Sequence, residues 1–143
     1  AIAANVMIDN TDPTKPFMMS YFPIPEVPEG YPWKNFCDRP GRFGPHNANN
    51  EIHNQDVMQP NDLIHLAYFN AGIRVYDIAE PRLPKEVGWF IPGDPETPKR
   101  SQSGYLPISI TQEVLIDTRG NIFTSGATGM YVLRNSGDIA DRW

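Results

Sequence analysis

The stretch GIRVYDIAEPRLP, residues 72–84, decides the fold of this chain. In residues 75–79 the side chains alternate in character, which is the two-residue period of a β-strand. An acid and two prolines, Pro81 and Pro84, then interrupt the run, because proline cannot donate to a strand ladder. Residues 86–91 resume an extended apolar pattern. The stretch and its continuation therefore predict two strands joined by a turn, an antiparallel hairpin.

The same hairpin pattern occurs near the start of the sequence. Residues 6–23, VMIDNTDPTKPFMMSYFP, match residues 75–92, VYDIAEPRLPKEVGWFIP, at four anchors. The anchors are Asp9 with Asp77, Pro13 with Pro81, Pro16 with Pro84, and Phe22 with Phe90. Because all four share one register shift, we interpret the two segments as copies of one unit.

Two further matches extend the unit. Residues 63–78, LIHLAYFNAGIRVYDI, hold two strand-like runs joined by Asn-Ala-Gly, a sequence that suits the positive φ of a tight turn. Residues 121–134, NIFTSGATGMYVLR, repeat them with Gly129 at the place of Gly72. Ahead of each pair stand a polar residue, Gln, an acid and Val, as NQDV at residues 54–57 and TQEV at residues 111–114.

In chain order the pattern predicts two strands, then four, then three. The strands fall at about residues 4–23, 54–92 and 110–134, and long loops at residues 24–53 and 93–109 join them. Four-stranded antiparallel units repeated around an axis are β-propeller blades. We therefore expect an all-β chain that forms a single partial propeller, with one complete blade and two partial ones.

The pattern G-[IM]-x-V-x-D-I-x-x-P-x-x-P in residues 72–84 resembles the LVIVD-repeat proteins, whose repeat forms propeller blades. The resemblance covers residues 6–22 and 63–90 well, residues 114–134 fairly, and the long loops poorly. A closed propeller needs about four to eight blades, and this chain supplies roughly two to three. We expect the remaining blades from a second polypeptide, from the other half of a cleaved precursor, or from self-association.

Composition narrows the classes of partner. The chain has 143 residues, of which 40% are hydrophobic and 20% charged, an ordinary balance for one globular domain. A formal net charge of -5, with no run of Lys or Arg, argues against nucleic acid or an anionic membrane surface. Fifteen prolines argue against long helices. A small molecule or another protein is the expected partner.

The sequence suggests a soluble chain of undetermined compartment. No apolar run reaches the roughly 18 residues that a membrane-spanning helix needs, and the first residues lack the basic and apolar regions of a signal peptide. Two alternatives stay open. The chain is cytosolic, or it is a processed or truncated form that could lie outside the cytoplasm. Its one cysteine, Cys37, cannot form an internal disulfide.

The loop at residues 24–53 is unusually long for a connection without functional or structural purpose. It carries Tyr31, Trp33 and Phe36, aromatic residues that disordered linkers lack. Together with Arg42, which could hold an anionic substrate or bridge to a partner, these residues form a predicted substrate or partner loop. The alternative is that the aromatic side chains anchor the loop to its own blades.

The end of that loop, GPHNANNEIHNQD at residues 44–56, holds two of the three histidines. His46 and His53, with Glu51 or Asp56, would make a two-histidine, one-carboxylate set, which suits iron, manganese or zinc. We therefore take His46 and His53 as candidate metal ligands and Glu51 and His53 as candidate catalytic residues. The alternative is that these side chains fix the loop by hydrogen bonds.

The repeat separates scaffold from candidate site. Gln55 and Asp56 recur as Gln112 and Glu113, and a residue repeated in each blade usually bonds neighbouring backbone groups. His53 instead aligns with Ile110, so it stands outside the repeat. The third histidine, His65, lies at the place of Phe123 and is expected to pack against a neighbour.

Two functions follow from this sequence. The first is a small-molecule site at the channel mouth of a propeller assembly, with metal-assisted hydrolase, lyase or oxidase chemistry. The second is a propeller face that serves as a non-catalytic platform for protein binding. The nucleophile elbow, the P-loop, the dinucleotide fingerprint and the zinc-protease helix motif are all missing from the sequence, so none of those chemistries is indicated.

Overall fold

The computed structural model describes residues 4–49, 54–58, 62–96, 108–126 and 129–142. Within these residues the secondary structure is all β apart from one 3-10 turn. The elements are β1 (Val6–Asp9), β2 (Phe17–Tyr21), β3 (Leu63–Ala67), β4 (Ile73–Asp77), β5 (Lys85–Phe90), β6 (Val114–Ile116), β7 (Ile122–Gly126), β8 (Gly129–Leu133) and η1 (Gly137–Ile139). None of the helical structure in the described residues is long and apolar enough to cross a membrane.

The strands form three antiparallel sheets, β1-β2, β3-β4-β5 and β6-β7-β8. The all-β expectation is confirmed, and so is the hairpin predicted from residues 72–91, which forms as β4 and β5. The predicted four-stranded blade is not among the three sheets, which hold two, three and three strands.

The repeat is visible in the strand pairing. In β1–β2, Met7 pairs with Ser20 and a bulge follows before Ile8 pairs with Met18. In β4–β5, Val75 pairs with Gly88 and a bulge follows before Tyr76 pairs with Glu86. Met7 and Val75, like Ile8 and Tyr76, are equivalent under the register shift that joins Asp9 to Asp77. The two hairpins therefore share an irregularity at the same position, which is typical of copies of one unit.

The hairpin turns repeat as well. Oδ1 of Asp9 accepts a hydrogen bond from the backbone N–H of Thr11, at 2.9 Å. Oδ1 of Asp77 accepts the same bond from Ala79, also at 2.9 Å. An aspartate that bonds the backbone two residues ahead forms an Asx turn, so each acid closes its own turn.

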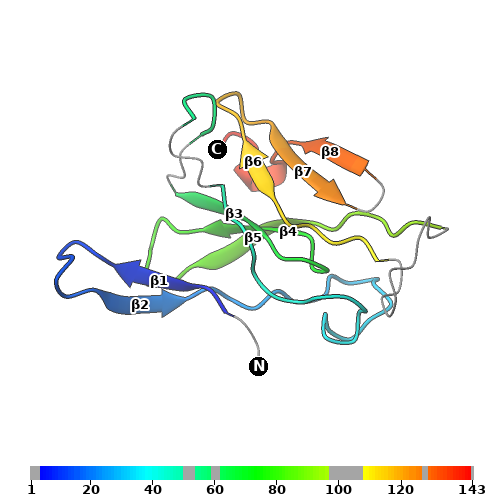
Figure 1. The fold of residues 1–143 in the computed structure, drawn as a ribbon, viewed down its shortest axis with the longest axis horizontal. Helices are drawn as coiled ribbons and strands as arrows, with labels where there is room; N and C mark the ends of the chain where they lie inside the picture. The colour runs from blue at the N-terminus through cyan, green and yellow to red at the C-terminus, as the bar shows by residue number, and fades with distance from the viewer. Residues whose placement is uncertain (1–3, 50–53, 59–61, 97–107, 127–128, 143) are drawn as a thin grey trace.

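The sheet β3-β4-β5 lies between the other two sheets (Figure 1). One of its faces packs Leu66 and Tyr76 against Phe22 and Phe36, with Met7 of β1 beside them. The other face packs against β6–β8 in a cluster of Ala67, Ile73, Val114, Ile116 and Ile122. Each face of the central sheet is therefore covered by a different part of the chain, and the core lies in two parts, one on either side of this sheet.

Residues 42–49 lie along the edge of β3 that faces away from β4. The backbone N–H of His46 donates to the carbonyl of Ala67 at 2.8 Å, and the N–H of Ala67 donates to the carbonyl of Asn47 at 2.8 Å. Isolated bridges join Phe43 to Phe69 and Ala48 to Leu66. This segment takes the place beside β3 that the sequence assigned to residues 54–57.

Residues 54–57 do not begin a strand of the central sheet, so that expectation needs correction. Oδ1 of Asn54 accepts from the N–H of Asp56 at 2.9 Å, and its carbonyl accepts from Val57 at 3.1 Å, which makes a tight turn. Val57 then bridges Asp117, at the end of β6. The asparagine side chain competes with strand pairing, which explains the departure from the predicted blade.

Candidate functional site

His46 is held at the junction of the central sheet and β6–β8. Its Nδ1 lies 2.8 Å from the carbonyl oxygen of Gln112, and its ring centroid lies 4.7 Å from that of Phe69. Because a carbonyl oxygen only accepts, Nδ1 carries the proton and donates. In the neutral ring Nε2 then keeps its lone pair, which can accept a hydrogen bond or bind a metal.

Asn47 and Glu113 make the next contact between the same segments. Nδ2 of Asn47 donates to Oε1 of Glu113, and the carbonyl of Glu113 accepts from Oγ1 of Thr124 at 2.8 Å. Gln112 and Glu113 thus lie beside His46 and Asn47. The segment at residues 42–49 and the entry to β6 form one polar edge.

Gln55 and Asp56 lie elsewhere and are exposed. Asp56 contributes through its backbone, since its carbonyl accepts from the N–H of Thr118 at 3.1 Å. The two predicted scaffold pairs therefore have different surroundings, although their sequences match. Glu51 and His53 lie outside the described residues, so the full metal set of two histidines and one carboxylate stays a prediction.

A buried amide that the sequence analysis did not single out joins the layers. Nδ2 of Asn49 donates to the carbonyl of Met58 at 2.6 Å, and its Oδ1 accepts from the N–H of Ile116 at 2.9 Å. Asn49 is one of five amides in the stretch at residues 44–56, and nothing in the sequence distinguishes it from the others. It ties the polar edge to the core.

The ring of Phe69 contacts both His46 and Arg42 at the polar edge. The residue has a φ of 48°, which is unusual for a bulky side chain, and its backbone exchanges hydrogen bonds with Thr111 at 3.0 and 3.1 Å. The guanidinium carbon of Arg42 lies 4.9 Å from the ring centroid, within cation–π range. A cation and an imidazole therefore both contact one ring, an arrangement that suits a small anion or a planar ligand.

The aromatic loop, which we define as residues 31–43, folds onto its own chain. Phe36 is buried in the core, its ring stacks 5.9 Å from Phe43, and the guanidinium of Arg74 lies 4.7 Å above it. Phe36 is thus a loop anchor, and its side chain is not available to a partner. Tyr31 and Trp33 are half-buried, with centroids 6.4 Å apart.

Arg39 and Asn70 fasten the long loops to each other. Arg39 is buried, donates to the carbonyl of Asn70 and bonds Oδ1 of Asp94 at 2.6 Å. The same Oδ1 accepts from the N–H of Ser109 at 2.7 Å. Nδ2 of Asn70 lies within 3.2 Å of three loop carbonyls, those of Phe36, Arg39 and Pro40. The loop that leads to His46 is therefore positioned by a buried polar network.

Arg74 and Glu86 form a second ion pair, 3.0 Å apart, beneath the aromatic loop, in which the arginine is buried and the glutamate is partly exposed. Burial raises the pKa of Glu86, and the nearby guanidinium of Arg74 opposes this. Burial likewise lowers the pKa of Arg74, although Glu86 counteracts it. The arginine also donates from Nε to the carbonyl of Ala71 at 2.9 Å, so the pair is braced by backbone contacts.

His65 is fully buried and faces a separate cavity. Its Nε2 lies 2.9 Å from Oδ1 of Asn135, whose Nδ2 donates to the carbonyl of Arg142 at 2.6 Å. Asn135 therefore accepts, His65 donates from Nε2, and burial lowers the pKa of the ring. The cavity has a volume of about 550 Å³ and lies between β5 and β8. Its wall includes His65, Val75, Trp89, Leu133, Asn135 and Ile139.

Metal ligands are sparse among the residues that the structure describes, where no group of three or more His, Cys, Asp or Glu side chains could hold an ion. His46 is the described member of the predicted metal set with a free ring nitrogen on the polar edge. A metal at this place would need Glu51, His53 or a partner for its other ligands.

No protein-family model, curated protein or solved structure matches the chain. The resemblance to LVIVD-repeat proteins accordingly stays a prediction.

Proposed function

We propose that the chain is a segment or subunit of a β-propeller assembly that binds a small molecule at the polar edge around His46. The proposal of propeller blades is supported by the way the sheets stack. Met7 faces the central sheet. Its equivalent, Val75, faces the layer of β6–β8 and the C-terminal turn η1. Neighbouring sheets thus meet in the same sense each time, as blades do around an axis.

The observation that carries the small-molecule site is the fixed orientation of His46. The Gln112 carbonyl holds Nδ1 and the Phe69 ring supports the imidazole, so Nε2 is directed by contacts on two sides. Arg42 adds a positive charge within 4.9 Å of the centroid of the same ring. These groups can bind an anionic or carbonyl-bearing small molecule and can hold or move a proton at Nε2.

The chemistry that fits best is metal-assisted hydrolysis, elimination or oxidation. Iron, manganese or zinc would be held by Nε2 of His46, with His53 and Glu51 as the further candidates. When bound, the ion supplies Lewis-acid activation of substrate or water. Gln112 then acts as the outer partner that fixes the tautomer of His46, a common arrangement for metal-binding histidines.

The test is His46→Asn. The asparagine amide can replace the Nδ1 donor to Gln112 while it removes Nε2. We expect purified protein to hold a stoichiometric transition metal by elemental analysis, and His46→Asn and His53→Ala each to lower metal content at least tenfold with unchanged thermal unfolding. Gln55→Asn, an exposed amide away from the polar edge, is the control. Metal-free native protein, or full metal content in both histidine variants, would contradict the proposal.

A second function, a non-catalytic platform for protein binding, is favoured by the half-buried aromatic group beside β5. Tyr31 lies edge-on to Trp89 with centroids 6.0 Å apart, and Arg39 lies 5.0 Å from the Trp33 ring. Aromatic side chains such as Tyr31, Trp33 and Trp89 are enriched at interface centres, and the buried Arg39 holds Trp33 in place. If this function holds, Trp33→Ala weakens partner capture while His46→Asn leaves it intact.

A further inference from the structure

The first and last sheets leave apolar faces uncovered at opposite ends of the stack. On β1–β2, Val6 pairs with Tyr21 and Ile8 with Met18, and all four side chains are exposed. We name these four residues the back face. It lies on the side of the hairpin opposite to Met7, which packs on the central sheet.

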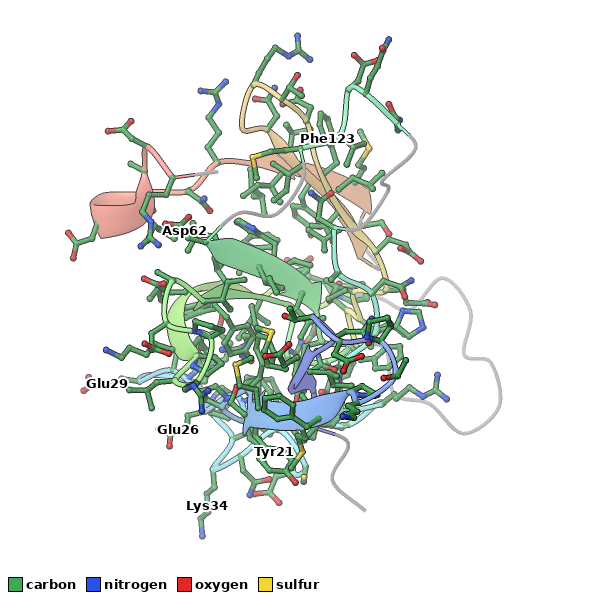
Figure 2. All side chains as sticks on the ribbon, turned by 90° about the vertical axis from the view of Figure 1, so that its left-hand side faces the viewer. Tyr21, Glu26, Glu29, Lys34, Asp62 and Phe123 are labelled. Atoms are coloured by element: carbon green, nitrogen blue, oxygen red, sulfur yellow. The ribbon has the colours of Figure 1, made fainter. Side chains whose placement is uncertain are left out.

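The last sheet exposes a second apolar row. Leu115 pairs with Phe123, and Phe123 pairs with Val132 on the neighbouring strand. Met130 extends the row along β8. We name Leu115, Phe123, Met130 and Val132 the forward face. Figure 2 shows Tyr21 of the back face and Phe123 of the forward face at opposite ends of the molecule.

The forward face has a buried counterpart inside the chain. Val132 pairs with Phe123 as Val75 pairs with His65, and Met130 is one residue past Gly129 as Ile73 is one residue past Gly72. Val75 is 6% exposed and Ile73 2%, because β6–β8 and the C-terminal turn cover them. Val132 is 56% exposed and Met130 72%. The same positions are thus core in one copy of the unit and surface in the next.

The back face has a buried counterpart too. Ile8 is equivalent to Tyr76, which is fully buried, whereas Ile8 is 54% exposed. Tyr21 is equivalent to Trp89, which contacts the aromatic loop through Tyr31. In the central sheet these positions are covered by Phe22, which follows β2, and by Tyr31 of the loop after it, so the exposed copies in β1–β2 correspond to a surface that is covered in the next unit.

We propose that the forward face of one chain docks on the back face of a second copy, so that the chain self-associates head to tail. The contact would continue the stacking by which the three sheets already meet within the chain. Clustered exposed apolar side chains of this kind mark interaction sites. Because the two surfaces differ, the contact is heterologous and generates a ring if the rotation closes. The inference rests on the blade-like stacking proposed above and not on the small-molecule site.

The experiment places one charge on each face. Ile8→Lys and Val132→Lys substitute exposed strand residues, and circular dichroism with thermal unfolding verifies that both variants fold. We expect the unaltered chain to form oligomers larger than dimers by light scattering and native mass spectrometry at micromolar concentration. Each variant alone should be monomeric, since one of its two faces is blocked. An equimolar mixture should form a one-to-one dimer, because each variant retains the face that the other lacks.

Four results would overturn the inference. The first is an unaltered chain that stays monomeric up to about 100 μM, well above the range of a micromolar contact. The second is an oligomer that survives both substitutions, and the third is one abolished by only one of them, which would indicate a face pairing with itself. A mixture that stays monomeric would also overturn it. Metal content is measured on the same samples, so failure of the small-molecule site appears separately.

Discussion

At the scale of the residue, Gly72 shows how closely the sequence is matched to its turn. Its φ is 80°, in the left-handed region that favours glycine. A Cβ at this position would lie 2.1 Å from the backbone oxygen of Phe90 and 2.9 Å from the Cα of Ile91. Two independent constraints, conformation and close approach of β5, therefore reserve the position for glycine.

Gly72→Ala should therefore destabilise the chain strongly. We expect a loss of at least about 3 kcal/mol in the free energy of unfolding, because backbone atoms must move. Gly30→Ala is the matched control, since Gly30 has a φ of 85° and no atom lies within 4 Å of the place that a Cβ would take. It should cost only about 1 kcal/mol. Equal losses in urea unfolding would show that the contact with Phe90 is unimportant.

His65 makes stability depend on pH. Its pKa is lowered in the folded chain by burial, and its Nδ1 has no hydrogen-bond partner among the described residues. The unfolded chain takes up the proton near a pKa of about 6.5, and the folded chain resists it to lower pH. The contribution is therefore complete above about pH 7 and is lost as pH falls through the interval between the two pKa values.

His65→Gln removes that titration while its amide can still donate to Asn135. We expect the unaltered chain to lose stability as the pH falls below about 7, and the variant to show a flatter profile over the same range. Urea midpoints at half-unit pH steps are the measurement. Parallel profiles for the two proteins would assign the pH dependence to other groups.

At the scale of the element, the C-terminal segment at residues 134–142 fastens the central sheet. Ile139 packs on Leu63 and Val75, and Arg142 bonds the carboxylates of Asp62 at 2.8 Å and Asp77 at 3.0 Å. The hydrogen bond from Arg142 holds the pKa of Asp77 below its usual value. An apolar contact and a partly exposed ionic contact thus both hold the C-terminal segment to the central sheet.

The apolar contact should dominate. Ile139→Ala should cost about 2 kcal/mol, the lower end for a buried isoleucine, because the site borders the open cavity beside His65. Arg142→Gln should cost clearly less than Ile139→Ala, since exposed ion pairs contribute little. The comparison by thermal unfolding in low and high salt separates the two, and a larger loss in Arg142→Gln would reverse the assignment.

At the scale of the whole molecule, local patterns predicted the hairpins and non-local contacts escaped prediction. The hairpin of β4 and β5 follows from alternation, from Asp77 and from two prolines within a short span. The placement of residues 42–49 beside β3 could not be predicted, because a polar run such as GPHNANN lacks strand alternation. The bond between His46 and Gln112 joins residues 66 apart, and no spacing rule connects them. The sequence left open whether the aromatic loop folds onto the chain or onto a partner, and the burial of Phe36 shows that this part of it folds onto the chain.

If the chain assembles as proposed above, the stacking of equivalent sheets has a consequence for how the size of that assembly is specified. Each layer covers one surface and exposes a copy of the surface it has just covered, as Val132 does for Val75. Adding a layer therefore leaves the growing end unchanged, and no single contact records how many layers are present. The count must instead be set by the angle between successive layers. Small changes in wedge-filling side chains such as Phe90 and Tyr131, whose rings meet 5.1 Å apart, would alter the count without altering any layer.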